Sequence, residues 1–462
     1  MKVFENEDQF HKKLNKNTKK INPSKEQVLS KAFQFHSQGN ISEAAKYYQY
    51  CINQGFADAK VFSNFGVLLR GLGKLKEAEL STRKAIELNP NYAFAHLNLG
   101  GILKDLGNFK EAELSVRKAI ELDPNCASAY FSLSTLKYDN ESNLWINKLF
   151  SKNFLNNKNI QDQINIYFAR ANILHNDKKY QESSKCLQSA NKLKLDIKKS
   201  QSENRINKSK ILFIETNKRE ISQKKSTNSP QSIFIVGMPR SGSTLLESIL
   251  SINSNVDALG ETNIFKESFL NWKKPLQKST LAELYLNKTN TKSNESRTTT
   301  NKWLYNYLYA GIISTQIPNC KIIHCFRNPL DNILSIYRAH FRSGNEYASS
   351  LKDCANVYLH HEEIINDYIK QNPLIIYKLN YDELVTKPEK QIKLLVNWLG
   401  WKWENAYLKP HKNPRSVTTA SNVQIRSPIN SKSIGGWRNY KNLLKPAIEI
   451  LIKNEKYLNL ID

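Results

Sequence analysis

Residues 232–247 read SIFIVGMPRSGSTLLE, and this stretch decides the fold of the second half of the chain. The apolar run 232–236 predicts a buried strand, and Gly237 permits a sharp turn after it. A short loop of Gly, Pro and Ser follows, and residues 242–251 have the pattern of a helix. A strand, a glycine-containing loop and a helix, in this order, form the outline of a phosphate-binding loop.

The loop departs at one position from the nucleotide-binding pattern G-x-x-x-x-G-K-[ST]. That pattern requires a lysine at 243, where this chain has Ser243 followed by Thr244. The backbone N–H groups of 240–244 and the two hydroxyls still favour an anion, and Arg240 adds a planar fork suited to an oxyanion. Without the lysine, ordinary ATP hydrolysis is not expected. A plain strand–turn–helix without a ligand is the alternative interpretation.

The rest of the second half alternates between short apolar runs and helical patterns. The expected strands cover 321–326 and 374–379, and the expected helices cover 302–314, 328–341 and about 349–370. Asn328 is a good helix N-cap residue, and Pro329 suits the first helical position. This alternation predicts a parallel, doubly wound α/β sheet with flanking helices.

The first half of the chain repeats itself at an offset of 34 residues. NFGVLLRGLGKLKEAELSTRKAIELNPNYA begins at Asn64, NLGGILKDLGNFKEAELSVRKAIELDPNCA begins at Asn98, and a weaker copy precedes both. Two helical patterns followed by a proline at this period resemble the tetratricopeptide repeat. Small residues such as Gly66 and Ala78 let two helices approach closely, and Pro90 ends the second helix. One hairpin cannot bury its apolar face, so the copies must stack as a solenoid.

These patterns divide the chain into four parts. We expect a polar N-terminal tail at 1–25, an all-α tetratricopeptide-repeat solenoid at 26–200, a linker at 201–230 and the α/β domain at 231–462. The end of the solenoid, 129–200, is expected to hold degenerate helical repeats. The polar and charged residues after it fit a surface helix as well as a linker.

The composition predicts a folded, strongly basic chain. Of its 462 residues 40% are hydrophobic, and 68 Lys and Arg against 42 Asp and Glu give a formal net charge of +26. The lysines are spread along the chain, which favours a solvated surface over a binding patch. No Cys/His finger, RNP-like aromatic pair or basic heptad region is visible, so nucleic acid is not an expected partner.

The cysteines and the apolar runs bear on the compartment. The 6 cysteines are scattered without CxxC spacing, which argues against a zinc site and a disulfide framework. No N-terminal signal-peptide pattern and no run of 18 apolar residues is found. We therefore expect no metal, no transmembrane segment and a cytoplasmic location.

Two motifs together carry a family resemblance. GMPRSGSTLL at 237–246 and FRNPLDNILS at 326–335 resemble the P-loop-like sulfotransferases that use 3′-phosphoadenosine 5′-phosphosulfate (PAPS). The resemblance implies that PAPS is the cosubstrate and that its nucleotide contacts the loop. The implied loop contacts are Pro239, Arg240, Ser241, Gly242, Ser243 and Thr244.

The second motif supplies residues for the 3′-phosphate, the group that separates this donor from ATP. Arg327 follows an expected strand, at the edge where open α/β sheets bind ligands. Ser335 lies eight residues on, about two helical turns into the next helix. The two resemble the pair that holds the 3′-phosphate, and Arg338, three residues past Ser335, is a third candidate.

Four further residues resemble those of the tyrosylprotein sulfotransferases. Glu261 lies 21 residues after Arg240, as the catalytic base does in that group, and Lys302 matches its catalytic lysine. Tyr381 matches a tyrosine near the nucleotide, and Ser421 aligns with the start of a C-terminal segment that clamps the nucleotide. In that segment Gly436 stands where relatives tend to carry a basic residue, a contact that Arg438 could replace.

The resemblance implies an in-line transfer of the sulfonyl group to an acceptor hydroxyl, which depends mostly on positioning and positive charge. Glu261 would take the acceptor proton, and Lys302 would stabilise the leaving oxygen. Arg240 and Ser421 would steady the sulfonyl group or the 5′-phosphate. These four residues are the expected catalytic set.

Several tempting residues are set aside. His324 lies in an expected strand and is interpreted as a satisfied core histidine. His360 and His361 are adjacent, so on a helix they diverge and make a poor joint metal site. Trp401 and Trp403 are expected to cap a helix–sheet interface.

The acceptor is left open between a peptide tyrosine and a glycan, lipid or small hydroxyl compound. The repeats offer a concave surface for a protein or peptide partner, and a homodimer is left open. Two other functions are considered: a tetratricopeptide scaffold with an inactive nucleotide-binding half, and a P-loop NTPase. Nucleotide binding discriminates among the three.

Overall fold

The structure, a computed structural model, describes residues 24–55, 58–136, 144–217, 229–289, 297–341, 344–415, 417, 419 and 421–460. The chain divides into two compact units, Met1–Leu133 and Ser134–Asp462. Most of the expected N-terminal tail, and residues 218–228 of the expected linker, lie outside the described residues.

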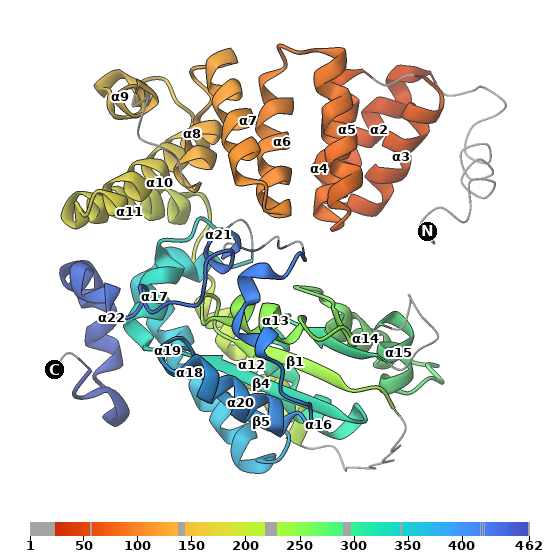
Figure 1. Ribbon diagram of the computed structural model, residues 1–462, viewed down its shortest axis with the longest axis vertical. Helices are drawn as coiled ribbons and strands as arrows, with labels where there is room; N and C mark the ends of the chain where they lie inside the picture. Colours follow the sequence, from red (N-terminus) through yellow and green to blue (C-terminus); the bar gives the residue numbers. More distant parts are fainter. Residues whose placement is uncertain are drawn as a thin grey trace. The chain divides into compact units, whose positions relative to one another are not determined.

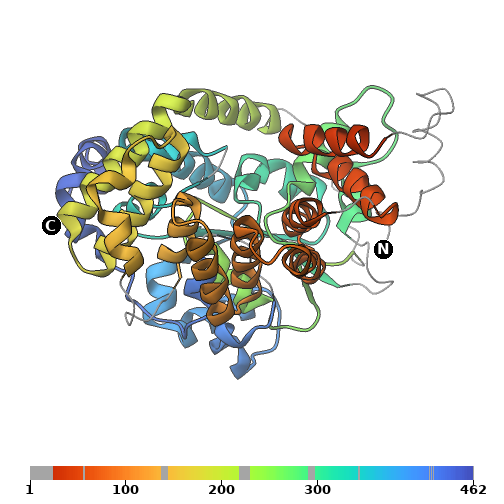
Figure 2. The same ribbon diagram turned by 90° about the horizontal axis from the view of Figure 1, so that it is seen from above.

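The first unit consists of helices that pack in consecutive pairs (Figures 1 and 2). The pairs are α2 (Lys25–Ser37) with α3 (Ile41–Asn53), α4 (Ala59–Gly71) with α5 (Leu75–Leu88), and α6 (Ala93–Leu106) with α7 (Phe109–Leu122). The chain then enters α8 (Ala127–Ser134). The expected solenoid of helical hairpins is confirmed in this unit.

Glycine sets the close approach within two of these pairs. A Cβ on Gly66 of α4 would lie 2.1 Å from Thr82 Oγ1 of α5. A Cβ on Gly100 of α6 would lie 2.5 Å from Val116 Cγ2 of α7. Real side chains do not tolerate such distances, so the repeated glycine is required by the packing, as the 34-residue period predicts.

In the described part of the second unit, α-helices precede the sheet. They are α9 (Leu144–Phe150), α10 (Ile160–Asn176), α11 (Tyr180–Ile197) and α12 (Ser202–Asn217). Helices α10 and α11 pack against each other as a hairpin, and α12 packs against α18 (Leu351–Gln371). Much of the expected linker is therefore a helix packed on the α/β fold, whereas the domain limits at 200 and 230 stay a prediction.

A five-stranded parallel sheet forms the core of the second unit (Figure 1). Its order is β2 (Val256–Ala258), β3 (Thr298–Asn301), β1 (Ser232–Gly237), β4 (Cys320–Phe326) and β5 (Ile376–Asn380). In register, Ser232 pairs with Thr299 on one side and with Cys320 on the other. From β1 the chain turns first to one edge and later to the other, so ligands are expected at the carboxyl end of β1.

Helices cover both faces of the sheet. Phe234 and Val236 of β1 face a core built with α14 (Ile264–Trp272), α15 (Leu281–Thr289), α16 (Ala310–Gln316) and α18. Ile233 and Ile235 face a second core, built with α13 (Ser243–Leu250), α19 (Tyr381–Thr386) and α20 (Pro388–Trp398). The strand is buried on both faces, which confirms the doubly wound α/β prediction.

Three further elements bear on the site. They are α17 (Pro329–Tyr337), α21 (Asn422–Ile425) and the 3₁₀ turn η7 (Gly436–Tyr440), which leads into α22 (Lys441–Leu451). Asn328 caps α17 as predicted, accepting bonds from the N–H groups of Leu330 and Asp331. Among the described residues, no helix is both long and apolar enough to cross a membrane.

Candidate active site

The loop after β1 is shaped by two glycines with positive φ. Gly237 has φ +148°, and a Cβ there would lie 2.3 Å from the carbonyl oxygen of Cys325. Gly242 has φ +95°, and a Cβ there would lie 2.2 Å from the ring of Tyr381. Arg240 also has a positive φ, +67°. The loop therefore turns tightly at the carboxyl end of β1 and leads directly into α13.

The start of α13 offers hydrogen-bond donors to a ligand. Ser243 and Thr244 are its first residues, and N–H groups there have no intrahelical acceptor. Within the described part of the chain, the buried hydroxyl of Ser241 has no hydrogen-bond partner. The carbonyl of Pro239 accepts a bond from Asn332 Nδ2 at 2.9 Å, which ties the loop to α17. These features fit an anion held in the loop.

Arg240 joins the loop to two distant segments. Its Nε donates to Ser335 Oγ of α17 at 3.0 Å, and its Nη2 donates to Gln424 Oε1 of α21 at 2.9 Å. Its Nη1 donates to Ser421 Oγ. Sequence reasoning identified Arg240, Ser335 and Ser421 but not Gln424, which lies on a four-residue helix without a motif of its own.

Arg327 leaves the end of β4 and lies buried beside Tyr381. Its guanidinium is 4.8 Å from the centre of the Tyr381 ring, and its Nη2 donates to the Ser433 carbonyl at 2.7 Å. Tyr381 Oη forms a hydrogen bond with Ser433 Oγ at 2.9 Å. Among the described residues, the buried Nε of Arg327 has no hydrogen-bond partner. The guanidinium also forms two long ion pairs, from Nε to Asp382 Oδ1 at 3.9 Å and from Nη2 to Asp331 Oδ2 at 3.8 Å, so this buried cation is only partly paired.

Three arginines form a cationic cluster. Burial, together with the nearby guanidiniums of Arg327 and Arg338, lowers the pKa of Arg240 to about 10. Burial also lowers the pKa of Arg338. The charges of Arg327 and Arg338 disfavour the charged form of Arg240, and a bound anion would relieve that repulsion. The cluster fits phosphate or sulfate oxyanions.

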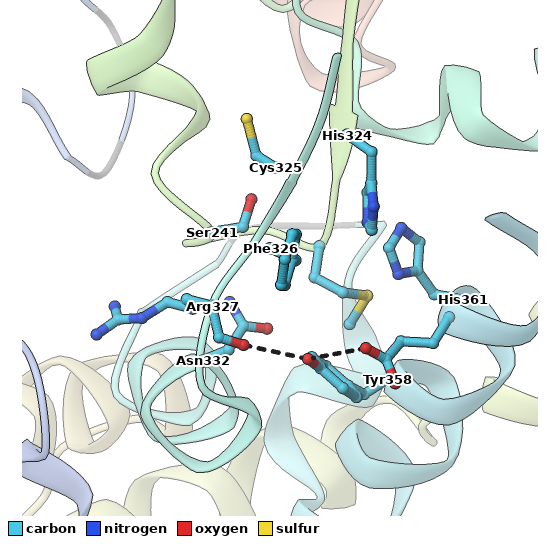
Figure 3. A pocket seen from close by; sticks show the side chains of 10 residues that line it. Ser241, His324, Cys325, Phe326, Arg327, Asn332, Tyr358 and His361 are labelled. Carbon is cyan, nitrogen blue, oxygen red and sulfur yellow. Dashed lines mark hydrogen bonds between the residues drawn. The ribbon is translucent and has the colours of Figure 1, made fainter. Parts of the chain in front are cut away.

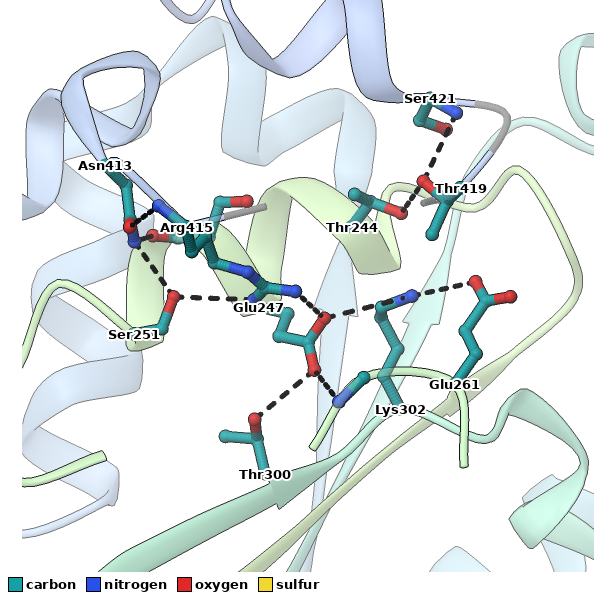
Figure 4. Close-up of polar contacts among 12 residues, drawn as sticks. Thr244, Glu247, Ser251, Glu261, Thr300, Lys302, Asn413, Arg415, Thr419 and Ser421 are labelled. Carbon is teal, nitrogen blue, oxygen red and sulfur yellow. Dashed lines mark hydrogen bonds and ion pairs between the residues drawn. The ribbon is translucent and has the colours of Figure 1, made fainter. Parts of the chain in front are cut away.

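A buried lysine contacts two carboxylates next to the loop (Figure 4). Lys302 follows β3 and is fully buried; its Nζ lies 2.8 Å from Glu261 Oε1 and 3.8 Å from Glu247 Oε2. Glu261 follows β2, and 47% of its side chain is exposed. The pairing of Lys302 with Glu261 brings together the residue expected as the base and the residue expected to stabilise the leaving oxygen.

Glu247 was not predicted, yet it joins several parts of this network. Its carboxylate is fully buried on α13 and accepts from Arg415 Nη2 at 2.6 Å. It also accepts from the Gly260 N–H at 3.2 Å and from Thr300 Oγ1 at 3.4 Å. A glutamate three residues after Thr244, at the end of an apolar helical run, was the available signal.

A C-terminal segment lies against the loop. Thr419 Oγ1 lies 3.2 Å from Thr244 Oγ1, and the Ser421 N–H donates to Thr419 Oγ1 at 3.3 Å (Figure 4). Further along, the N–H groups of Gly435 and Trp437 donate to Asp331 of α17 at 2.7 and 3.0 Å. Ser421 therefore lies at the loop, as expected.

Gly436 and Arg438, which the sequence associates with the nucleotide clamp, lie in this C-terminal segment, and no nucleotide contact of either is shown. Gly436 lies between the two amides that contact Asp331, and Arg438 is exposed with its guanidinium 4.9 Å from the centre of the Trp437 ring. A nucleotide contact by Arg438 stays a prediction.

A small cavity lies beneath the loop and exposes an error in the sequence analysis (Figure 3). His324 and His361 line it, both buried, with ring centroids 5.0 Å apart. Within the described residues, none of their four ring nitrogens has a hydrogen-bond partner. His324 is a core histidine, as expected, but not a satisfied one, because the Phe326 ring stacks on it and the tilted His361 ring contacts it without a hydrogen bond.

The other residues set aside behave as expected. His360 contacts Ser209 and Glu363, away from the partners of His361, so the two rings diverge. Trp401 and Trp403 pack against the core shared by β1, α13 and α20. Across the described chain, no three His, Cys, Asp or Glu side chains gather in a metal-binding arrangement.

Comparison with known proteins assigns regions of the chain. Residues 230–280 and 272–405 match the model of the sulfotransferase family. Residues 59–92 and 93–126 each match a tetratricopeptide repeat. The chain therefore carries a sulfotransferase-family region, which includes the loop, Lys302 and Arg327, and two tetratricopeptide repeats, as the sequence analysis predicts.

Individual relatives match about half of the chain. An uncharacterized protein of Aquifex aeolicus (strain VF5) is 33% identical over 254 residues, covering 50% of this chain and 33% of its own length. A protein-tyrosine sulfotransferase of Drosophila melanogaster is 24% identical over 234 residues, covering 44% of this chain and 46% of its own length. This chain thus spans less than half of either relative.

Among solved structures, a mouse sulfotransferase complexed with PAP is similar at 17% identity and a TM-score of 0.33. The similarity covers 50% of this chain and 88% of that one.

Proposed function

We propose that this protein transfers a sulfonyl group from PAPS to an acceptor hydroxyl. One observation carries the proposal: the cluster of Arg240, Arg327 and Arg338 lies at the end of the sheet where Lys302 also contacts Glu261. An NTPase loop needs a lysine for the γ-phosphate, whereas this loop has Ser243, contains Arg240 and lies near Arg327 and Arg338 of other segments.

The cluster supplies cations for both ends of the donor. The loop N–H groups and Arg240 bind the 5′-phosphosulfate, because a helix start and a planar guanidinium both favour an oxyanion. Arg327, Ser335 and Arg338 bind the 3′-phosphate. Tyr381 packs on Gly242 and Arg327, so it fixes the loop and the arginine together beside the nucleotide.

In the reaction, the acceptor oxygen forms a bond to sulfur while the bond from sulfur to the 5′-phosphate oxygen breaks. Glu261 accepts the acceptor proton, and Lys302 stabilises the charge that develops on the leaving phosphate oxygen. The Lys302–Glu261 pair must separate in part for each residue to reach its target. Glu247 retains the buried ammonium in position when Glu261 turns to the acceptor.

The first acceptor to test is a peptide tyrosine. The half-exposed Glu261 supports an acceptor that arrives from solvent, and a relative is named a protein-tyrosine sulfotransferase. The tetratricopeptide repeats support a protein or peptide partner. The unbridged cysteines of the described chain support a reducing compartment, such as the cytoplasm, for the reaction.

Calorimetry with the full chain tests the nucleotide assignment. We expect 3′-phosphoadenosine 5′-phosphate (PAP) to bind at least tenfold more tightly than ATP, because only PAP offers a 3′-phosphate to the arginine cluster. Tighter binding of ATP would revive the NTPase alternative.

Labelled PAPS incubated with the protein and a cell extract tests the transfer and identifies the acceptor. We expect label to reach a hydroxyl-bearing molecule with the unaltered protein but not with Glu261→Ala. Binding of PAP without any transfer would favour the alternative of a scaffold with an inactive nucleotide-binding half.

A further inference from the structure

Arg338 extends from the C-terminal end of α17 and lies over an aromatic ring from another segment. Its guanidinium is 5.8 Å from the centre of the Tyr440 ring, within the range of a cation–π interaction. Tyr440 ends η7 and is buried. The charge of Arg338 acts on Arg240, and the face of the Tyr440 ring stabilises the Arg338 guanidinium in this position.

Tyr440 is itself held by the hairpin of α10 and α11. Its hydroxyl donates to Ser183 Oγ of α11 at 3.0 Å and lies 2.9 Å from His175 Nδ1 of α10. Tyr180 of α11 packs edge-on against the Tyr440 ring at 5.4 Å. Tyr440 therefore has its polar tip in the hairpin and its ring beside Arg338.

The direction of this hydrogen-bond chain follows from its last member. Ser183 uses its proton to donate to the Ala171 carbonyl at 2.8 Å, so its oxygen must accept from Tyr440. The Tyr440 oxygen is then the acceptor for a proton on His175 Nδ1. Burial, with the charge of Arg338, lowers the pKa of His175 to about 3, so the histidine is neutral and donates through Nδ1. Every hydroxyl in the chain has one fixed orientation.

Helix α11 also holds the backbone at the end of α17. Asn191 Nδ2 donates to the Tyr337 carbonyl at 3.0 Å, and Lys194 Nζ donates to the Phe341 carbonyl at 2.8 Å. Carbonyls at a helix C-terminus lack intrahelical donors, so these side chains fix the point from which Arg338 extends. The hairpin thus controls both the backbone and the ring that locate Arg338.

We propose that the α10–α11 hairpin determines selectivity for the 3′-phosphate, with Tyr440 as the positioning residue for Arg338. The inference rests on the proposed function, since it assigns the 3′-phosphate to Arg338 and its neighbours. A helical hairpin that precedes the sulfotransferase-family region becomes part of the nucleotide site in this interpretation.

The test compares two nucleotides that differ only in the 3′-phosphate. Calorimetry with the full chain measures the Kd for PAP and for adenosine 5′-monophosphate (AMP). Tyr440→Leu removes the ring, and we expect affinity for PAP to fall roughly threefold to thirtyfold while affinity for AMP is unchanged. Ser183→Ala breaks the hydrogen-bond chain on the hairpin side. We expect a smaller fall in the ratio of PAP affinity to AMP affinity.

Ser189→Ala on α11 is the matched control, because its hydroxyl only donates to the Lys185 carbonyl on the exposed side of that helix. This variant should keep the ratio of PAP affinity to AMP affinity that the unaltered protein has. Tyr440→Phe retains the ring and replaces Tyr440→Leu if the latter does not fold; it should lose selectivity to the extent of Ser183→Ala.

The possible results distinguish a failure of this inference from a failure of the proposed function. An unchanged ratio in Tyr440→Leu and Ser183→Ala, or an equal loss of both nucleotides, overturns the positioning role. An unaltered protein that binds PAP no better than AMP overturns the 3′-phosphate assignment itself. A selective loss of PAP in both variants supports the inference.

Discussion

Lys302 Nζ lies 2.8 Å from Glu261 Oε1, although the lysine is fully buried and the glutamate is half exposed. The residues follow β3 and β2, two neighbouring parallel strands, so the sheet itself brings them together at its carboxyl edge. In the proposed reaction, the exposed carboxylate of Glu261 would meet the acceptor, and the buried ammonium of Lys302 would meet the donor. The two proposed tasks would then fall to the two ends of one ion pair.

Replacing Glu261 should abolish turnover without removing the nucleotide. Glu261→Ala is expected to lower kcat by about two to four orders of magnitude, the usual contribution of a general base. Its affinity for PAP should change little, because the cationic cluster is built from other residues. Labelled-donor turnover and PAP calorimetry measure the two effects separately.

The control for this variant is Glu267→Gln, on the exposed surface of α14, where Glu267 pairs with Lys288 at 3.0 Å. It should turn over at the normal rate. Near-normal turnover in Glu261→Ala would remove the residue from the mechanism.

Replacing Glu247 should destabilise the fold. Glu247→Gln removes the carboxylate that lies 2.6 Å from the largely buried Arg415, whereas the buried Lys302 keeps Glu261 at 2.8 Å. Removing one partner of a buried ion pair typically costs about 3–5 kcal/mol, because the other charge stays desolvated. Urea unfolding should show a loss of roughly that size.

An exposed pair gives the comparison. Glu389→Gln on α20 removes the partner of Lys393 at 2.6 Å, where both side chains are more than half exposed. Surface pairs contribute about 0–1 kcal/mol, so little change is expected. Equal effects of the two variants would argue against a buried network at Glu247.

Restoring the lysine of the NTPase pattern should not restore NTPase activity. Ser243 is buried at the start of α13, and Ser243→Lys would add a long charged side chain next to the arginine cluster. We expect PAP affinity to fall at least tenfold and ATP hydrolysis to stay at background. Ser254→Lys, an exposed position after the same helix, is the control. A gain in ATPase activity would contradict this account of the loop.

Arginine at 240 should not be replaceable by lysine. Three nitrogens of Arg240 contact three different side chains, and one ammonium cannot span Ser335, Ser421 and Gln424. Arg240→Lys should weaken PAP binding by about tenfold or more, even though the charge is kept. Calorimetry measures this loss. Lys432→Arg, which exchanges lysine for arginine at an exposed position, is the control. Full PAP affinity in Arg240→Lys would show that charge alone suffices.

Local patterns in the sequence predicted the elements that carry their own signals. The apolar run and glycines around Gly237 predicted β1 and its loop, and the 34-residue period predicted the helix pairs with Gly66 at their contact. Strands β2 and β3 were missed because they are three and four residues long, and because β3 consists of polar residues only. β3 forms by pairing with β1, and β2 forms by pairing with β3, and no local window contains these partners.

The missed site residues depend on contacts that are distant in sequence. Arg415 contacts Glu247 across 168 positions, and Gln424 contacts Arg240 across 184. A charged residue on a helix is usually solvated, so neither Glu247 nor Arg415 stands out in a list of residues. The sequence left the region before 230 open between a surface helix and a linker, and it did not reveal the packing of α12 for a similar reason: Arg205 of α12 stacks on Tyr305 and Tyr347, far along the chain.

The unsatisfied histidines under the loop should make stability depend on pH. Burial lowers the pKa of His361 to about 3, and burial with the neighbouring His361 lowers that of His324 well below its usual value. An unfolded histidine titrates near pH 6.5, so between these values the unfolded chain binds more protons and stability falls as pH falls.

From pH 7 to pH 5, each of these two histidines should lower the free energy of unfolding by roughly 2 kcal/mol. The free energy of unfolding of His361→Phe should therefore fall by roughly 2 kcal/mol less than that of the unaltered protein over the same range. Urea unfolding at several pH values measures the slopes. Tyr307→Phe, which alters the ring packed 4.4 Å from His361 but keeps both histidines, should retain the original slope. An unchanged slope in His361→Phe would mean that partners such as ordered water already satisfy the ring nitrogens in the folded protein and let it titrate normally.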